Sequence, residues 1–253
     1  MLPTLLIGEI ALPTYPLSLL IAFWAGLTLA AYLAQGLNLE SDHVYNAGLY
    51  GFVAGILGAR LWFVLSHWEN YASDLGQALS LSRSALSVPE GFIIAALVVV
   101  IYLQRNKVPI ATFMDAVGPG IALALVIGNL GAFLGGVKLG APATVPWAIE
   151  LVNTPRHPVQ LYEAGATLIV LGLLILWRQQ RPWPGFQFWL FVLLYSTVRL
   201  GLEIFIARPA VVGNGFLAVQ LYALSAIVLS LAVMAYNFKT DSDSTEVHPH
   251  EVI

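Results

Sequence analysis

The chain has 253 residues, of which 58% are hydrophobic and only 10% are charged. Because soluble domains carry about 25% charged residues, this composition excludes an ordinary soluble domain and predicts an integral membrane protein. The absence of cysteine excludes disulfides, thiolate metal sites and a cysteine nucleophile within the chain. The net charge of −3 gives no basic surface for nucleic acid.

Apolar runs predict an all-α fold with seven transmembrane helices, since a helix needs roughly 20 mostly apolar residues to cross a bilayer. The runs cover residues 16–35, 44–66, 89–104, 112–135, 158–177, 186–206 and 216–237. They divide the chain into an external N-terminal segment (1–15), a transmembrane domain (16–237) and a polar cytoplasmic tail (238–253). We expect the tail to be disordered on its own, because it is polar and lacks periodicity.

Basic loops predict the orientation of these helices. The segments QRNKVP (104–109) and RQQRPWPG (178–185) are the clearest basic turns between spans. Since cytoplasmic loops carry an excess of Lys and Arg, both turns are predicted to lie in the cytoplasm. The N-terminus is then outside and the C-terminus inside.

Charged residues inside the predicted spans carry the functional information, because a charge at mid-bilayer costs about 2.5–3.5 kcal/mol on insertion scales. The first is Arg60, in GILGARLWFV (55–64). Its guanidinium must meet protein, water or a lipid headgroup, and its fork of donors suits a phosphate. The others that we single out are Asp115, Glu163, Arg199 and Glu203.

The glycine-rich stretch GNLGAFLGGVKLG (128–140) has two interpretations. Gly131 and Gly135 have the small-xxx-small spacing that lets helices approach closely. Glycine also exposes backbone to which a phosphate could bind. We favour helix packing, because no neighbouring cation is evident in the pattern.

The stretch RHPVQLYEAG (156–165) predicts a helix that begins at Pro158, a residue suited to the first helical position. The free N–H groups and positive dipole end of that helix form a potential anion site beside Arg156 and His157. Tyr162 and Glu163 lie one turn inside. The alternative is an interfacial helix start without a binding role.

Tyr195, Arg199 and Glu203 follow an i, i+4, i+8 spacing and form one stripe on a helix. One interpretation is an ion pair that neutralises itself and fixes helix packing. The other is a hydrated cavity in which Arg199 holds an anion and Glu203 orients it.

Together and in this order, these stretches resemble the prolipoprotein diacylglyceryl transferase family of the bacterial inner membrane. The likeness covers about residues 12–236 and is clearest in RHPVQLYEA. The other matching parts are AGLYGFVAGILGARLWFVL, GAPATVPWA, and the Tyr, Val-Arg, Glu and Arg-Pro of 195–209. Members of the family transfer the diacylglyceryl group of phosphatidylglycerol to the lipobox cysteine of a prolipoprotein, and glycerol phosphate leaves. The resemblance implies the same seven spans, and neither a cofactor nor a metal is expected.

Two sets of residues match the family pattern by position. The resemblance implies catalytic roles for His157, Tyr195, Arg199 and Glu203. It implies contacts with the lipid phosphate for Tyr15, Arg60, Arg156, Gln160, Tyr162, Glu163 and Arg208.

Other signature positions are substituted in this chain. Asn129 stands where the family pattern has arginine, and Ala141 stands at its second arginine. The remaining substitutions replace two asparagines, a glutamate and a histidine, at Ala132, Gly135, Val137 and Pro89 respectively. The glycines of the frame are kept while the polar groups between them are lost, which indicates retained packing and lost chemistry.

Three functional hypotheses follow. The first is a catalytically degraded family member that serves as a structural or lipid-binding subunit, with other membrane-protein subunits as partners. The second is an active transferase with phosphatidylglycerol and a prolipoprotein signal peptide as partners. The third, a transporter or channel, lacks the paired broken helices typical of such folds.

Overall fold

The computed structural model describes residues 2–8, 10–72, 76, 86–151, 153–207, 211–212 and 216–246. This part of the chain is mostly helical and holds seven helices that are long and apolar enough to cross a membrane. The predicted fold class is therefore confirmed, whereas the side on which each terminus lies stays a prediction. The chain forms two compact units: residues 1–30 with 114–253 (unit 1), and residues 31–113 (unit 2).

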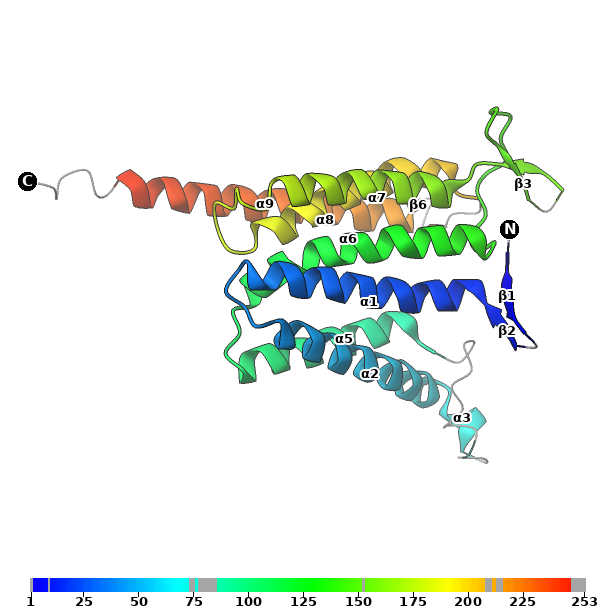
Figure 1. Cartoon of the computed structure of the whole chain (residues 1–253), viewed down its shortest axis with the longest axis horizontal. Coiled ribbons are helices and arrows are strands. Elements are labelled where there is room, and N and C mark those ends of the chain that lie inside the picture. The colour runs from blue at the N-terminus through cyan, green and yellow to red at the C-terminus, as the bar shows by residue number, and fades with distance from the viewer. Residues whose placement is uncertain are drawn as a thin grey trace, which may run out of the picture. The chain divides into compact units, whose positions relative to one another are not determined.

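The long helices follow the predicted apolar runs closely (Figure 1). They are α1 (Thr14–Gln35), α2 (Ser41–Ser66), α5 (Val88–Arg105), α6 (Ile110–Leu134), α7 (Val159–Leu176), α8 (Phe186–Leu202) and α9 (Ala218–Glu246). A short 3-10 helix, η2 (Glu203–Phe205), continues α8. Helix α9 extends past residue 237 into the segment that we expected to be disordered, and it ends at Glu246.

Three small hairpins and a short helix, which the apolar runs did not predict, complete the described secondary structure. Strands β1 (Thr4–Ile7) and β2 (Ile10–Pro13) pair antiparallel immediately before α1. The other hairpins are β3 (Ile149–Glu150) with β4 (Pro155–Arg156), and β5 (Val211–Val212) with β6 (Phe216–Leu217). Helix α3 (Trp68–Tyr71) follows α2. All of these segments are too short to span a bilayer. In the hairpins, strand pairing satisfies the backbone groups.

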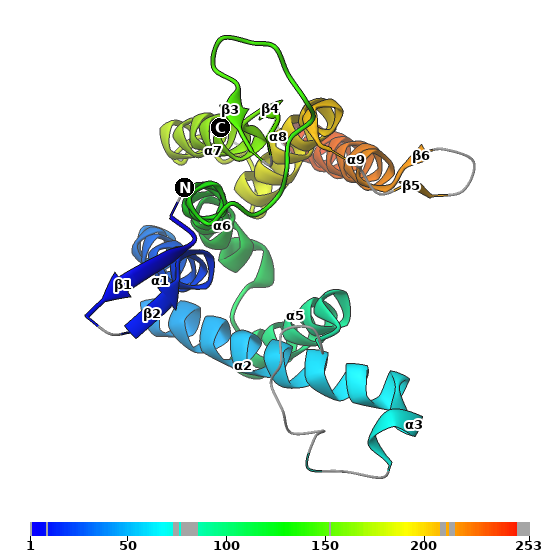
Figure 2. The same ribbon diagram turned by 90° about the vertical axis from the view of Figure 1, so that its right-hand side faces the viewer.

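In unit 2, helices α2 and α5 pack through small residues (Figure 2). A Cβ atom added to Gly91 would lie 2.7 Å from the carbonyl oxygen of Gly55 and 2.7 Å from the Cβ of Ala59. Another added to Gly58 would lie 2.6 Å from Ile94 Cδ1. Glycine therefore lets these two helices come close enough to bury Arg60, which follows directly in α2.

In unit 1, glycines of α6 face α1. A Cβ added to Gly120 would lie 2.5 Å from the carbonyl oxygen of Gly26. At Gly131 the added atom would lie 1.7 Å from Ser18 Oγ, and just beyond α6, at Gly135, it would lie 2.9 Å from Tyr15 Cβ. The packing interpretation of the glycine-rich stretch is thus confirmed.

Asp115 in α6 secures the start of α8. Its Oδ2 accepts a hydrogen bond from the Gly185 N–H at 2.8 Å, and its Oδ1 accepts one from the Phe188 N–H at 3.2 Å. Arg181 Nη1 lies 3.6 Å from the same carboxylate. The first N–H groups of a helix have no partner within it, so a buried carboxylate in this position replaces the missing acceptors. Beyond this contact α8 packs on α7 around Leu174, in a cluster that also includes Ala122, Val170, Leu190 and Phe191.

We predict that Gly131→Ala destabilises the fold by about 1–3 kcal/mol, because its methyl group overpacks the α1–α6 contact. The measurement is the thermal unfolding midpoint of the protein in detergent. Gly165→Ala is the matched control, since an added Cβ at this glycine of α7 meets nothing within 4 Å. Equal midpoints for the two variants would contradict the packing assignment.

Candidate functional site

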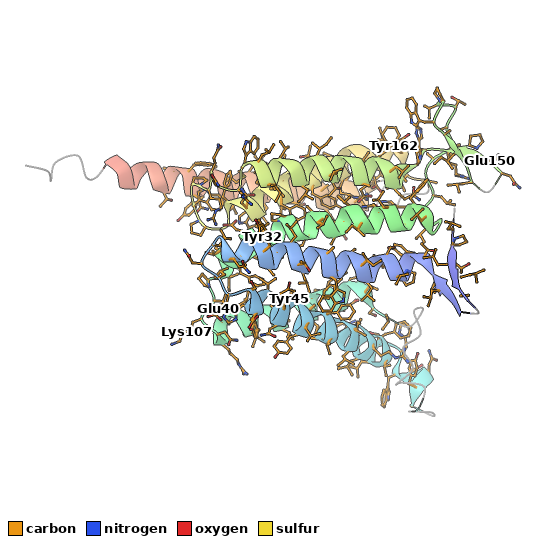
Figure 3. All side chains as sticks on the ribbon, in the orientation of Figure 1. Tyr32, Glu40, Tyr45, Lys107, Glu150 and Tyr162 are labelled. Atoms are coloured by element: carbon orange, nitrogen blue, oxygen red, sulfur yellow. The ribbon has the colours of Figure 1, made fainter. Side chains whose placement is uncertain are left out.

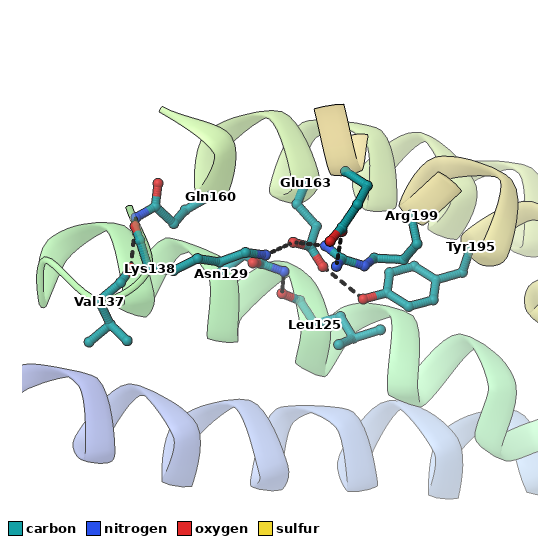
Figure 4. Close-up of polar contacts among 9 residues, drawn as sticks. Leu125, Asn129, Val137, Lys138, Gln160, Glu163, Tyr195 and Arg199 are labelled. Carbon is teal, nitrogen blue, oxygen red and sulfur yellow. Dashed lines mark hydrogen bonds and ion pairs between the residues drawn. The ribbon is translucent and has the colours of Figure 1, made fainter. Parts of the chain in front are cut away.

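The carboxylate of Glu163 in α7 is the centre of a polar cluster in unit 1 (Figure 4). Its Oε2 accepts from Lys138 Nζ at 2.5 Å and from Arg199 Nη1 at 3.0 Å. Its Oε1 accepts from the Tyr195 hydroxyl at 2.8 Å. One buried carboxylate therefore receives donors from the loop after α6 and from two turns of α8.

Arg199 connects Glu163 to a second carboxylate. Its Nη2 donates to Glu203 Oε2 at 3.1 Å, across the junction between α8 and η2. The predicted stripe of Tyr195, Arg199 and Glu203 therefore forms, and it faces Glu163. We call the set Lys138, Glu163, Tyr195, Arg199 and Glu203 the Glu163 cluster.

The charges of the cluster balance. Two cations, Lys138 and Arg199, meet two carboxylates, Glu163 and Glu203. The carboxylate side chains are only 5% and 2% exposed, whereas those of Arg199 and Lys138 are 17% and 29% exposed. The cluster is thus neutral as a whole, with its carboxylates at the buried end and its cations at the more exposed end.

Lys138 is the site residue that sequence reasoning missed. We treated the glycine-rich stretch as lacking a neighbouring cation, and the structure corrects this. Lys138 lies four residues beyond the last residue of α6, and its side chain turns back to reach Glu163. The available signal was a lone basic residue directly after a glycine-rich helix end.

Gln160 holds the backbone that carries Lys138. The Gln160 Nε2 donates to the Val137 carbonyl at 2.7 Å and to the Lys138 carbonyl at 2.5 Å. The side chain is buried, and its Oε1 has no hydrogen-bond partner. The role that the structure gives Gln160 is therefore to position a loop.

His157, Tyr162 and Trp147 form a second network next to the cluster. The Trp147 Nε1–H donates to the Tyr162 hydroxyl oxygen at 2.6 Å, and His157 Nδ1 lies 3.1 Å from the same oxygen. An indole only donates, so the Tyr162 proton is available to His157 Nδ1. Phe205 packs edge-on against both His157 and Tyr162. Figure 3 places Tyr162 near the start of α7 and Glu150 on the neighbouring β3–β4 hairpin.

Arg156 contacts backbone rather than the cluster. Its Nε donates to the Leu151 carbonyl at 3.2 Å and its Nη1 donates to the Gly140 carbonyl at 3.1 Å. Helix α7 begins at Val159, with Pro158 preceding it and not in the first helical position. These bonds tie β4 to the loop after α6, and the predicted anion site at the start of α7 stays a prediction.

The remaining predicted binding residues are described by their own contacts. Arg60, in unit 2, stacks over the rings of Tyr71 and Phe63, with its Cζ 5.2 and 6.0 Å from their centroids. Tyr15 begins α1 beside Gly135. Arg208 lies outside the described residues.

The six positions predicted to be substituted carry no ionisable side chain, and their substitution stays a prediction. The Asn129 amide donates to the Leu125 carbonyl one turn back in its own helix, at 2.9 Å. Ala132 is buried, and Val137 is 39% exposed. The other three are backbone positions: Gly135 and Ala141 donate N–H bonds to Gly131 and Phe205, and Pro89 lies in the first turn of α5. Among the described residues, no group of three or more His, Asp or Glu side chains is placed to hold a metal ion.

The sequence matches the family model for prolipoprotein diacylglyceryl transferase over residues 3–236. A phosphatidylglycerol–prolipoprotein diacylglyceryl transferase of Corynebacterium efficiens is 32% identical over 243 residues, covering 86% of this chain and 73% of the relative. The protein of that name from Thermus thermophilus is 28% identical over 265 residues, covering 90% and 95%. That of Bordetella avium is 32% identical over 206 residues, covering 78% of each chain. These bacterial relatives and the seven spanning helices together give a multi-pass protein of the bacterial cell membrane.

We predict that Glu163→Ala lowers the free energy of unfolding by about 1–3 kcal/mol, because it removes the shared acceptor and leaves the Tyr195 hydroxyl and the Lys138 ammonium without this partner. Thermal unfolding in detergent measures the effect. Glu150→Ala is the control, since Glu150 is an exposed glutamate on the nearby hairpin. A loss no larger than that of Glu150→Ala would mean that the cluster does not hold α7 and α8 together.

Proposed function

The chain belongs to the prolipoprotein diacylglyceryl transferase family, and from this premise we propose that it is a working transferase. It binds phosphatidylglycerol beside the Glu163 cluster and transfers the diacylglyceryl group to the lipobox cysteine of a prolipoprotein. The observation that carries the proposal is the pair of cations, Lys138 and Arg199, held on one carboxylate within the spanning part. Ionisable side chains at membrane depth mark functional sites by default.

The reaction sets two requirements. The cysteine sulfur forms a bond to the terminal glycerol carbon, the bond from that carbon to the phosphate oxygen breaks, and glycerol phosphate leaves with the electron pair. Positive charge must therefore lie near the departing phosphate. The thiol must also lose its proton, since the thiolate is the nucleophile.

The cluster supports both requirements. Lys138 and Arg199 supply positive charge at its more exposed end. Glu163 and Glu203 supply carboxylates as proton acceptors. Arg199 is fixed by two carboxylates at once, at 3.0 and 3.1 Å, so its orientation is set before a substrate arrives.

His157 supports the binding of an anionic oxygen. When the Tyr162 hydroxyl donates to Nδ1, the proton of the neutral imidazole lies on Nε2. That N–H then points away from the bond with Tyr162, as a donor. In the proposed site His157 is therefore a hydrogen-bond donor to the phosphate and not the base.

We predict that Arg199→Ala lowers the transfer rate by at least about a hundredfold, the loss typical of one preorganised donor to developing charge. The assay uses the purified protein reconstituted with phosphatidylglycerol and a lipobox-cysteine peptide, with the peptide followed by mass spectrometry. Arg178→Ala, at an exposed arginine after α7, is the control and should transfer normally. A family enzyme with the full signature is the positive control.

Arg199→Lys separates folding from chemistry in this assay. It keeps a charge beside Glu163 but cannot bridge two carboxylates as the planar guanidinium does. We expect the unfolding midpoint of Arg199→Lys to lie closer to that of the wild type than the midpoint of Arg199→Ala does. We still expect Arg199→Lys to transfer the diacylglyceryl group slowly. Transfer at the wild-type rate by a folded Arg199→Ala protein would contradict the role proposed for Arg199.

A second candidate function is lipid binding without transfer, in which the chain is a subunit of a larger membrane assembly. The observation that favours it is the absence of charge at Asn129, Ala132, Val137 and Ala141, the substituted signature positions. The neutral balance of the cluster also favours it, because ion pairs alone can explain its charges. In the same assay this function gives bound phosphatidylglycerol and no mass shift of the peptide beside an active positive control.

A further inference from the structure

We propose that Lys138 is a mobile cation that leaves Glu163 to bind the phosphate of an anionic lipid headgroup. The inference rests on the proposed function, since it names the residue through which that site recognises its lipid.

Glu163 has more donors than it needs. Its Oε2 accepts from both Lys138 and Arg199, and its Oε1 accepts from Tyr195. If the Lys138 ammonium departs, Glu163 keeps Arg199 and Tyr195, so no buried charge loses its last partner. Arg199 cannot depart in the same way, because it also holds Glu203. Lys138 is therefore the cation that the cluster can release.

Exposure favours the same residue. The Lys138 side chain is 29% exposed and Arg199 is 17% exposed, while the carboxylates are 5% and 2% exposed. An ammonium on a flexible four-carbon stem can turn from an inner carboxylate to an outer phosphate. A phosphodiester oxygen accepts the same charge-assisted hydrogen bond that the carboxylate accepts.

The backbone of Lys138 is held in an unfavourable conformation. Its φ is 70°, in the left-handed region that residues other than glycine rarely adopt. It follows the end of α6, where Gly136 at φ 66° donates to the Phe133 carbonyl and Val137 donates to the Ala132 carbonyl. This 5→2 and 6→1 pair of bonds is a Schellman motif, which ends the helix with glycine in the left-handed position.

Two anchors keep the strained residue in place. On one side the buried Gln160 amide binds the carbonyls of Val137 and Lys138. On the other side the next residues pair with the end of η2 and the chain after it, where Ala207 donates to the Leu139 carbonyl and Ala141 donates to the Phe205 carbonyl. The backbone at Lys138 is thus fixed, and the proposed movement requires only its side chain to turn. Strain maintained by surrounding bonds is typical of functional positions.

The test is binding of dioctanoyl phosphatidylglycerol to the full chain in detergent. Lys138→Met keeps the length of the side chain and removes the charge, and we expect it to weaken binding roughly tenfold to a hundredfold, the loss of one charged hydrogen bond. Lys138→Arg should restore most of the affinity. Lys107→Met is the matched control, because Lys107 is an exposed loop lysine that also has a left-handed φ, of 55°.

Two further probes separate recognition of the phosphate from folding. Dioctanoylglycerol has the acyl chains without phosphate, and Lys138→Met should bind it like the wild type. Equal weakening for both lipids, or unchanged affinity for phosphatidylglycerol, would overturn the proposal. Glycerol phosphate has the phosphate without acyl chains. If the wild type binds it and Lys138→Met does not, Lys138 recognises a free phosphate group. If neither protein binds glycerol phosphate, Lys138 recognises the phosphate only as part of a lipid headgroup.

Gln160→Leu tests the anchor. It removes the amide that binds the Val137 and Lys138 carbonyls and leaves every charge in place. We expect weaker binding of phosphatidylglycerol and unchanged binding of dioctanoylglycerol. The ratio of these two affinities would not change if the variant were only less stable. Gln104→Leu, at an exposed glutamine of α5, is the control. An unchanged ratio in Gln160→Leu would overturn the positioning role.

Transfer and binding fail independently. Transfer by the wild type together with unchanged lipid binding by Lys138→Met would reject this inference and leave the proposed function standing. Selective loss of phosphatidylglycerol binding by Lys138→Met, with no transfer by the wild type, would support this inference and reject the proposed transferase function.

Discussion

The arrangement of unit 1 depends on one carboxylate, that of Glu163. Glu163 accepts hydrogen bonds from Lys138, Tyr195 and Arg199, and through Arg199 it is connected to Glu203. A carboxylate buried at membrane depth is unfavourable unless its oxygens are bonded, and here three donors converge on them. The same bonds that stabilise this buried charge also bring the ends of α6, α7 and α8 together.

Different constraints determine the glycines near the end of α6 and the Glu163 cluster. Gly131 and Gly135 approach Ser18 and Tyr15 so closely that a side chain at either position would collide with α1. This constraint is steric and holds whatever chemistry the protein performs. At Asn129, on the same helix, the side chain bonds to its own backbone and carries no charge into the cluster. Along α6 the glycines therefore serve helix packing, while Asn129 adds no charge to the cluster.

The spans and half of the site could be predicted from the sequence, since both follow from periodicity. The apolar runs located all seven helices, and the spacing of Tyr195, Arg199 and Glu203 placed them on one face. Lys138 could not be predicted in this way, because its reach to Glu163 depends on a left-handed backbone and on a bond from Gln160. Asp115 was visible as a charge within a span, but its partners are N–H groups about 70 residues further along.

The position of Lys138, on the loop after α6, determines how charge is balanced during the proposed reaction. The four ionised side chains of the cluster sum to zero before lipid binds. A bound phosphodiester adds one negative charge, which in our proposal Lys138 meets by leaving Glu163, so the Glu163 carboxylate then has one donor fewer. In the proposed step the substrate thiol passes its proton to Glu163. This makes the cluster and the bound phosphodiester neutral together and leaves the negative charge on the sulfur that attacks the glycerol carbon. Movement of one lysine would in this way couple recognition of the phosphate to activation of the nucleophile.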